Sequence, residues 1–298
     1  MLRPWRFESN IIFARLNASI RFSAIPSPRY GFTRAISDPS YPALLALINV
    51  QAKNLQTEKT EHFMSGWKAR IGYLSPSVFE TPSDWDLILP KGFTIVASGL
   101  NVQAHTTEEF NRAIEALEAG LGIFTAEECD AILLAGITLG TQRGYQAEQE
   151  VVSKLSQRVG LPVSTALNAG VEALRHLRAK TIVIATAYME KINQSVKRYY
   201  EDAGFQVLGI AGLEVKKPVD QVKLPDYASY KVAKGLFQKH PSVDAILIQG
   251  RWRSVAWVEE LERDSDRSVV SSTAASLWWV LRTLRMQIPI EGYGRLLR

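Results

Sequence analysis

Short apolar runs alternate along the chain with longer stretches in which apolar residues recur every three or four positions. The runs predict buried parallel strands, and the stretches predict amphipathic helices. Strands are predicted at residues 70–75, 94–99, 130–135, 162–164, 181–186, 206–210, 244–248 and 268–270. Helices are predicted at residues 107–121, 147–159, 169–177, 190–202, 227–239, 255–263 and 273–284. This alternation is typical of an α/β fold with parallel sheets.

An internal repeat runs through these strands. Residues 130–136 read DAILLAG, and residues 244–250 read DAILIQG. Two further pairs match in the same order, namely 70–75 with 180–185 and 161–165 with 268–272. The alternative is that any two buried strands look alike, but three ordered pairs favour a duplicated lobe.

The repeat predicts two pseudo-symmetric lobes, each a mostly parallel sheet flanked by helices. We expect the first lobe at residues 64–177, with a closing contribution from the C-terminus, and the second at residues 178–298. Because ligands of such sheets bind at the carboxyl ends of the strands, the site is expected in the cleft between the lobes. The loops expected to meet there follow Ser75, Ala135, Thr186 and Ile248.

The composition is that of an ordinary soluble protein, with 298 residues of which 46% are hydrophobic. No apolar run approaches the roughly 20 residues needed to span a bilayer, so no membrane partner is expected. Residues 1–63 hold eight Lys or Arg and four Asp or Glu, which leaves 27 and 26 of the totals of 35 and 30 for residues 64–298. That near balance predicts no nucleic-acid surface on the lobes.

Residues 1–63 are expected to lie outside the fold. The first 40 residues contain six arginines, no lysine and two acids, with serines interspersed. This composition is typical of an organelle transit segment, which would imply a mitochondrial location. The alternative is that translation begins at Met64 and that the extension is disordered or a gene-model artefact, which would imply a cytoplasmic protein.

Candidate chemistry lies in the strand-end loops. Residues 136–141 are rich in small and hydroxyl-bearing residues, so their backbone N–H groups suit an anion. No phosphate-loop or dinucleotide motif is present, and no cofactor is expected. Tyr188 follows the strand at 181–186, where its hydroxyl either donates to a carboxylate or packs between the lobes. The single cysteine, Cys129, excludes an intramolecular disulfide and a multi-cysteine metal site.

Several of these motifs together resemble the aspartate/glutamate racemase superfamily, and within it the arylmalonate decarboxylases more than the maleate cis-trans isomerases. The residues that carry the resemblance are 71–76, 136–144, 185–188, 270–272 and 292–296. The resemblance implies a cofactor-free enzyme that forms and protonates a carbanion or enediolate beside a carboxylate.

The resemblance also places catalytic cysteines at two strand ends, and both positions are glycine here. They are Gly136 and Gly250. Arylmalonate decarboxylases likewise have glycine at the first position but keep a cysteine at the second as proton donor. Cys129 precedes its strand, so it is expected at the opposite end of the sheet. His105 is an alternative proton donor, although an exposed loop histidine is the simpler interpretation.

The anion-binding groups of the family have counterparts in this chain. The resemblance implies that the hydroxyls of Thr138 and Tyr188, with the backbone amides of Thr138, Gly250 and Arg251, hold the carboxylate. It implies substrate contacts for Pro76, Gly136, Ile137, Leu139, Asn193, Leu100 and Leu213. Because Ile137 replaces a hydroxyl residue, the oxyanion hole would have one donor fewer.

Two arginines flank a tryptophan after the second glycine. Arg251 or Arg253 can bind a second acid group of the substrate, since guanidinium pairs with carboxylate in a bidentate way. The alternative is a solvated arginine pair with Trp252 packed on a neighbouring helix.

The motifs favour a cofactor-independent decarboxylase acting on a malonate-type or related carboxylic acid. The alternatives are an isomerase or racemase of a small carboxylic acid, and a non-catalytic carboxylate-binding homologue. Two-base racemisation is disfavoured because neither thiol is present. The expected partner is a small-molecule carboxylic acid, and the sequence leaves the oligomeric state open.

Overall fold

Two four-stranded parallel sheets organise the computed structural model, which describes residues 66–75, 82, 84–99, 120–135, 141 and 143–298. All of them belong to the unit Met64–Arg298. The first sheet has the order β2 (Phe93–Gly99), β1 (Ala69–Ser75), β3 (Ala131–Leu134) and β4 (Val163–Thr165). The second has the order β6 (Gln206–Ala211), β5 (Thr181–Thr186), β7 (Ala245–Gln249) and β8 (Ser268–Ser271).

The two sheets have the same strand order, which explains the internal repeat. The three sequence pairs form equivalent strands, namely β1 with β5, β3 with β7 and β4 with β8. β3 and β7 are buried at every residue because neighbouring strands and covering helices surround them. The prediction of two parallel α/β lobes is therefore confirmed.

Matching aspartates begin the repeat for a structural reason. The Asp130 carboxylate accepts a hydrogen bond of 2.8 Å from the Arg70 backbone N–H, beside the start of β1. In the second lobe, Asp244 accepts bonds of 2.8 Å from the N–H groups of Lys180 and Thr181, beside the start of β5. Each aspartate thus ties the chain entering a central strand to the amino end of its neighbour. These hydrogen bonds hold the pKa of Asp244 below its usual range.

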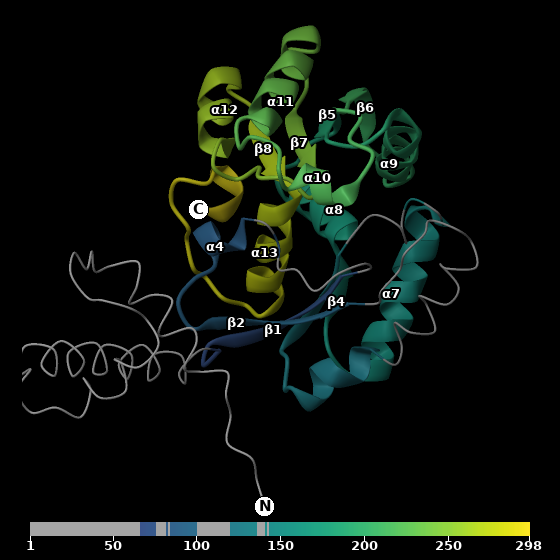
Figure 1. The fold of residues 1–298 in the computed structure, drawn as a ribbon, viewed down its shortest axis with the longest axis vertical. Coiled ribbons are helices and arrows are strands. Elements are labelled where there is room, and N and C mark those ends of the chain that lie inside the picture. The colour runs from purple at the N-terminus through teal and green to yellow at the C-terminus, as the bar shows by residue number, and fades with distance from the viewer. Residues whose placement is uncertain (1–65, 76–81, 83, 100–119, 136–140, 142) are drawn as a thin grey trace, which may run out of the picture. The chain divides into compact units, whose positions relative to one another are not determined.

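Among the described residues, six helices of eight residues or more cover the sheets, and two of them lie between the lobes. They are α7 (Tyr145–Val159), α8 (Ala166–His176), α9 (Glu190–Asp202), α11 (Ala228–Lys239), α12 (Val258–Ser265) and α13 (Ser272–Thr283). Figure 1 shows α8 and α13 between the two sheets, where they pack against each other. Thr165 and Ser271 cap these two helices by accepting hydrogen bonds from the first-turn amides.

The structure differs from the predicted elements mainly in its shortest helices. Neither α4 (Trp85–Ile88) nor α10 (Pro218–Gln221) was predicted, because one turn of helix leaves no periodic pattern. The predicted helix at 107–121 lies largely outside the described residues, although residues 120–126 are helical. The predicted helix at 190–202 has the same bounds as α9. Gly204, which follows this helix, has a φ of 96°.

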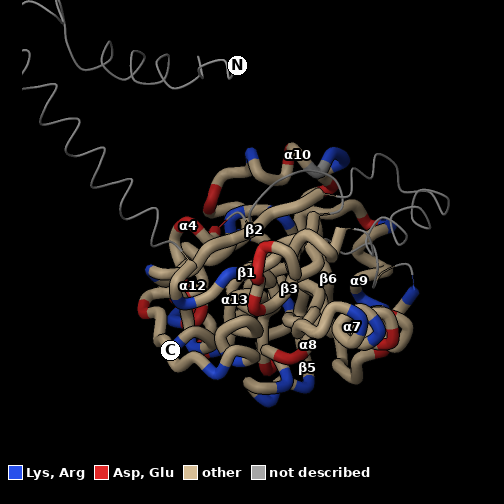
Figure 2. The backbone as a smooth tube through the Cα atoms, turned by 90° about the horizontal axis from the view of Figure 1, so that it is seen from below, with Lys and Arg blue, Asp and Glu red and all other residues tan. Residues whose placement is uncertain are grey.

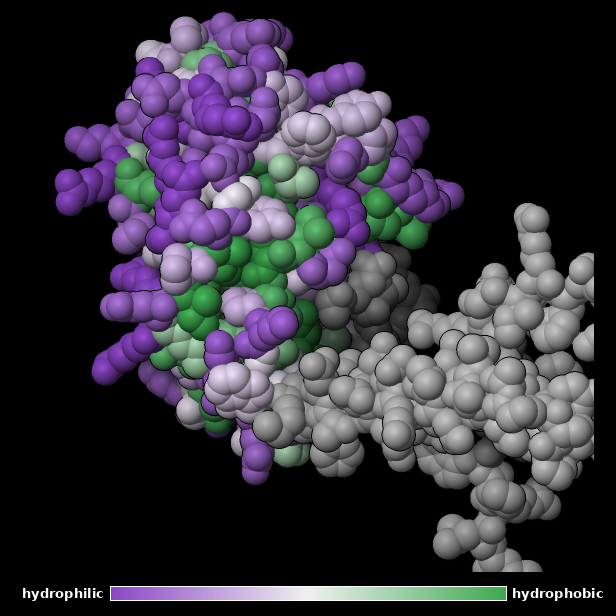
Figure 3. Space-filling view, turned by 90° about the vertical axis from the view of Figure 1, so that its left-hand side faces the viewer, coloured by the Kyte–Doolittle hydropathy of each residue, from purple (hydrophilic) through white to green (hydrophobic). Residues whose placement is uncertain are grey.

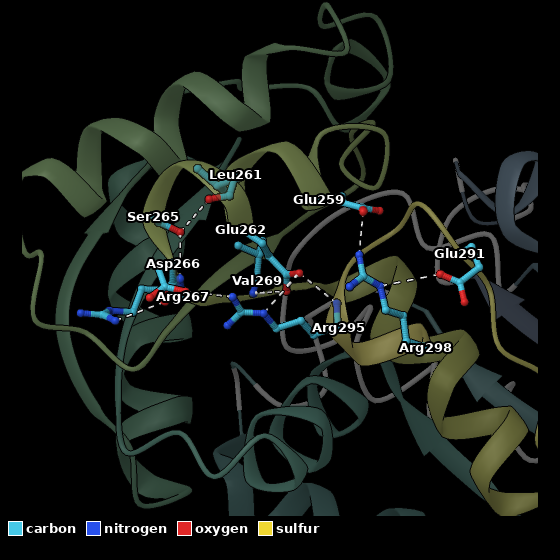
Figure 4. A network of polar contacts seen from close by, with 10 residues as sticks. All are labelled: Glu259, Leu261, Glu262, Ser265, Asp266, Arg267, Val269, Glu291, Arg295 and Arg298. Carbon is cyan, nitrogen blue, oxygen red and sulfur yellow. Dashed lines mark hydrogen bonds and ion pairs between the residues drawn. The ribbon is translucent and has the colours of Figure 1, made fainter.

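The C-terminal segment is bound to the second lobe by a network of charged groups. The buried carboxylate of Glu262 accepts hydrogen bonds from the backbone N–H of Val269 at 3.0 Å and of Arg295 at 2.9 Å. The Arg298 guanidinium donates to Glu259 at 2.6 Å (Figure 4). The short helix η1 (Arg295–Leu297) also buries its last two leucines, so the chain end is anchored by both polar and apolar contacts.

Charges of both signs are interspersed over the outer elements, including α7 and α12 (Figure 2). Figure 3 shows hydrophobic residues among hydrophilic ones on the face that carries α4. Leu87 of α4 is 43% exposed. Within the described residues, no helix is both long enough and apolar enough to cross a bilayer.

Candidate active site

Two tyrosines and an arginine come together where β1, β5 and β7 approach or reach their carboxyl ends. Tyr73 lies in β1, Tyr188 follows β5, and Arg251 follows β7. Tyr73 is near enough to raise the pKa of Tyr188, and Arg251 is near enough to lower that of Tyr73. The structure therefore joins groups from both lobes, as expected for the cleft of this fold.

Tyr188 is buried and held at its hydroxyl end. Its side chain forms a hydrogen bond with Gln249, the last residue of β7. The Gln249 side-chain oxygen Oε1 in turn accepts a hydrogen bond of 3.1 Å from the Tyr200 hydroxyl of α9. Burial raises the pKa of Tyr188 well above its ordinary range. The Tyr188 hydroxyl is therefore a neutral donor at physiological pH.

Asn193 contributes to the position of Tyr188 through Thr186. The Thr186 hydroxyl donates to the Asn193 carbonyl oxygen at 2.6 Å and accepts from the Tyr188 backbone N–H at 3.1 Å. Asn193 is fully buried, and its amide nitrogen has no hydrogen-bond partner among the described residues. Asn193 thus fixes the turn that carries Tyr188, and the direct substrate contact predicted for it stays a prediction.

Gly250 has a backbone conformation that side chains rarely adopt. Its φ is 137°, in the region that favours glycine. A Cβ placed on Gly250 would lie 3.3 Å from Cδ1 and Nε1 of Trp252 and 3.6 Å from Cζ of Tyr188. A cysteine at this strand end would consequently be strained and tightly packed.

Arg251 and Tyr73 interact electrostatically. Burial lowers the pKa of Arg251, although its guanidinium still carries a charge at neutral pH. Burial raises the pKa of Tyr73 to about 12. The Arg251 backbone N–H donates to the Gln221 side-chain oxygen at 3.3 Å. The amide predicted to hold a carboxylate is thus occupied by a side chain of α10 in this structure.

Arg253 is paired with carboxylates of the chain, and Trp252 is buried in an apolar cluster of the second lobe. Arg253 ion-pairs with Asp86 at 3.3 Å and lies 3.8 Å from the fully buried Asp84. The Asp84 carboxylate also accepts hydrogen bonds from the backbone N–H groups of Ser254 at 2.7 Å and of Val255 at 3.1 Å. Burial raises the pKa of Asp84. This contact attaches the segment before α4 to the loop after Trp252.

Several predicted site residues lie outside the described residues. They are Pro76, Leu100, Gly136, Ile137, Thr138 and Leu139, together with His105. Leu213 is described and is 40% exposed. It follows Gly212, whose Cβ, if present, would lie 2.2 Å from the Tyr188 carbonyl oxygen, so the chain passes close to the tyrosine here.

Tyr73, Tyr200, Gln221 and Gln249 were missed as parts of the site. Gln249 had a signal, because it is the one polar residue of the strand AILIQ and stands at its carboxyl end. Tyr200 had none, since its position matches an ordinary amphipathic helix and its partner Gln249 is remote in sequence. Among the described residues, no group of three or more His, Cys, Asp or Glu side chains is arranged to hold a metal ion.

Comparison with known proteins agrees with this architecture. The fold is that of two-lobed α/β enzymes that include arylmalonate decarboxylases and maleate isomerases. The arylmalonate decarboxylase family model matches residues 71–297, so the chain belongs to the arylmalonate decarboxylase family.

Individual relatives fall into the same two groups. Arylmalonate decarboxylase from Bordetella bronchiseptica is 27% identical over 228 residues, which cover 74% of this chain and 92% of the relative. Maleate isomerase from Nocardia farcinica is 30% identical over 174 residues, covering 56% of this chain and 67% of the relative.

Solved structures show the same fold. A liganded double mutant of arylmalonate decarboxylase has a TM-score of 0.71 at 23% identity and covers 77% of this chain and 98% of its own. Maleate cis-trans isomerase from Nocardia farcinica with a covalently bound succinylcysteine intermediate has a TM-score of 0.69 at 24% identity. The match covers 77% of this chain and 98% of the isomerase chain.

Proposed function

We propose that the protein is a cofactor-independent decarboxylase that acts on a malonate-type dicarboxylic acid through an enediolate. The observation that carries the proposal is the Tyr188 hydroxyl. The phenol is buried, bonded to Gln249 and kept protonated beside Gly250, and Thr186 accepts a hydrogen bond from the Tyr188 backbone N–H. A neutral donor held in that way suits an oxygen on which negative charge develops.

In this reaction the main role of the protein is to stabilise the negative charge that develops on the substrate. One carboxylate leaves as carbon dioxide, and the electron pair of the broken carbon-carbon bond passes into the remaining carboxylate to form an enediolate. A proton then adds to the carbon and gives a monocarboxylic acid. Donors aimed at the two oxyanions lower the barrier of the first step. Tyr188 supplies one such donor, and the nearby Arg251 supplies a positive charge.

The cysteine content favours decarboxylation over isomerisation. A related maleate isomerase has been solved with a covalently bound succinylcysteine. The single cysteine of this chain, Cys129, is buried in the apolar core beside β3. Burial raises the pKa of its thiol to about 11, so little thiolate forms at neutral pH. A covalent cysteine route therefore has no suitable nucleophile, whereas decarboxylation requires none.

The test is carbon dioxide release by the full-length protein from a panel of malonates, including phenylmalonate, methylphenylmalonate and benzylmalonate. We expect release with formation of the monocarboxylic acid. Tyr188→Phe is expected to lower kcat by about 10²- to 10³-fold, because one oxyanion donor is lost. Tyr227→Phe is the matched control, since Tyr227 is 45% exposed on the second lobe.

Two outcomes would contradict the proposal. Conversion of maleate to fumarate without carbon dioxide release from any malonate would favour an isomerase. Saturable binding of malonates with no turnover would favour a non-catalytic carboxylate-binding protein.

A further inference from the structure

The indole N–H of Trp252 is a buried donor that the described part of the chain leaves without an acceptor. Trp252 is 1% exposed, and its Nε1 has no hydrogen-bond partner among the described residues. Leaving a buried donor unpaired is costly, and most such groups in folded proteins are paired with protein or water. Where such an N–H faces a binding site, a ligand can supply the missing acceptor.

The position of this N–H points to the candidate active site. The Cβ direction of Gly250 leads to a point 3.3 Å from Nε1 of Trp252 and 3.6 Å from the ring carbon of Tyr188 that carries the hydroxyl. The pyrrole edge of the indole and the phenol end of Tyr188 thus flank the same point. Because Gly250 has no side chain, neither ring is pushed away from it.

The groups around this point favour an anion. Tyr188 remains a neutral phenol, Tyr73 has a raised pKa, and Arg251 is cationic. Asp84, which contacts the loop after Trp252, already accepts hydrogen bonds from the amides of Ser254 and Val255. The described surroundings of Trp252 Nε1 therefore offer donors and positive charge.

We propose that the Trp252 indole N–H donates a hydrogen bond to a carboxylate oxygen of the substrate, beside the Tyr188 hydroxyl. The inference deepens the proposed function and rests on it for the identity of the substrate as a dicarboxylate. An indole is a donor only and does not titrate, so Trp252 stabilises negative charge without supplying the proton that completes the reaction. It places a neutral donor at the strand end where the family resemblance places a thiol.

The first test measures binding of benzylphosphonate, a dianion that cannot lose carbon dioxide, to the full-length protein by calorimetry. Trp252→Phe keeps the aromatic bulk and removes the N–H, so Kd is expected to rise about tenfold to a hundredfold. Trp257→Phe is the matched control, because the Trp257 Nε1 is also buried and unpaired while its ring packs near Tyr230. Equal affinity of the Trp252 variant and the wild type would overturn the proposal.

A second measurement keeps the proposal testable where Trp252→Phe does not fold. The seven tryptophans give separate indole N–H signals in a ¹⁵N-labelled sample. The Trp252 signal is identified by its loss in the variant, or by elimination with single Phe variants of the other six. It is expected to move downfield when benzylphosphonate is added, while the Trp257 signal stays in place. A Trp252 signal that does not respond at saturation would overturn the proposal.

Turnover of malonates separates this inference from the proposed function. Dianion binding that depends on Trp252 without carbon dioxide release would support the donor and refute the decarboxylase. Carbon dioxide release with unchanged KM and kcat in Trp252→Phe would refute the donor and support the decarboxylase.

Discussion

Replacing Glu148 by Gln is expected to change how the stability of the protein depends on pH. Glu148 lies in the first turn of α7 and is 1% exposed. Its carboxyl group accepts a hydrogen bond from the Tyr199 hydroxyl of α9, in the other lobe, and forms another with Thr165. Burial raises the pKa of Glu148 from 4.5 to about 7, although both hydrogen bonds act in the opposite direction.

The raised pKa fixes both the sign and the size of the effect. Between pH 4.5 and about 7 the carboxyl group ionises in the unfolded chain but stays protonated in the folded protein. The folded state then binds more protons, so the free energy of unfolding falls as the pH rises. The shift from 4.5 to about 7 corresponds to a loss of about 3 kcal/mol at 1.36 kcal/mol per unit, complete above the folded pKa.

Glutamine keeps an oxygen that accepts from Tyr199 and removes this titration. Urea unfolding from about pH 5 to pH 8 should show the Glu148→Gln variant gaining up to about 3 kcal/mol relative to the wild type as the pH rises. Glu150→Gln, at an exposed position of the same helix, serves as control and should follow the wild-type curve. A constant difference between Glu148→Gln and the wild type over this range would refute the reasoning.

Two further substitutions test the packing of the C-terminal segment and of the segment before α4. Gly294→Ala should lower the urea midpoint more than Gly204→Ala, because φ is similar (92° and 96°) but only the Cβ at 294 would meet Val258 Cγ1, at 2.4 Å. The free energies of unfolding of the two variants should differ by about 1 to 3 kcal/mol. Equal urea midpoints would contradict this expectation. Asp84→Ala should lower the free energy of unfolding by about 2 to 6 kcal/mol in the same assay, because it leaves two buried amides at 254–255 unpaired. A loss below about 1 kcal/mol would count against Asp84 as the acceptor that holds these amides.

The lobes could be predicted from the sequence because their strands are buried on both faces. A strand such as β7, with four apolar residues in succession, is recognisable without knowledge of its neighbours. The segment at α4 has no such local signal. Asp84 is buried because it binds backbone amides of residues 254–255, far along the chain. Only the tertiary structure makes a charged residue there part of the interior.

The site could be predicted in part for a similar reason. Tyr188 was recognised because it follows a strand and matches a family motif at that position. The residues that hold it in place are set by contacts between elements, such as the bond from Tyr200 to Gln249. The unpaired state of Trp252 Nε1 likewise depends on its surroundings, and the sequence predicted only a choice between a solvated arginine pair and a binding loop.

The two copies of the repeat agree at one end and differ at the other. At the amino ends, Asp130 and Asp244 bind the neighbouring strand in the same way, so their similarity needs no ligand to explain it. At the carboxyl ends, the residues after Gly136 are ITLG, whereas those after Gly250 are RWRS. Because the scaffold is equivalent up to these glycines, the difference lies where a ligand would make its contacts. A glycine at φ 137° beside an indole N–H and a phenol favours chemistry by hydrogen-bond donors over chemistry by a thiol.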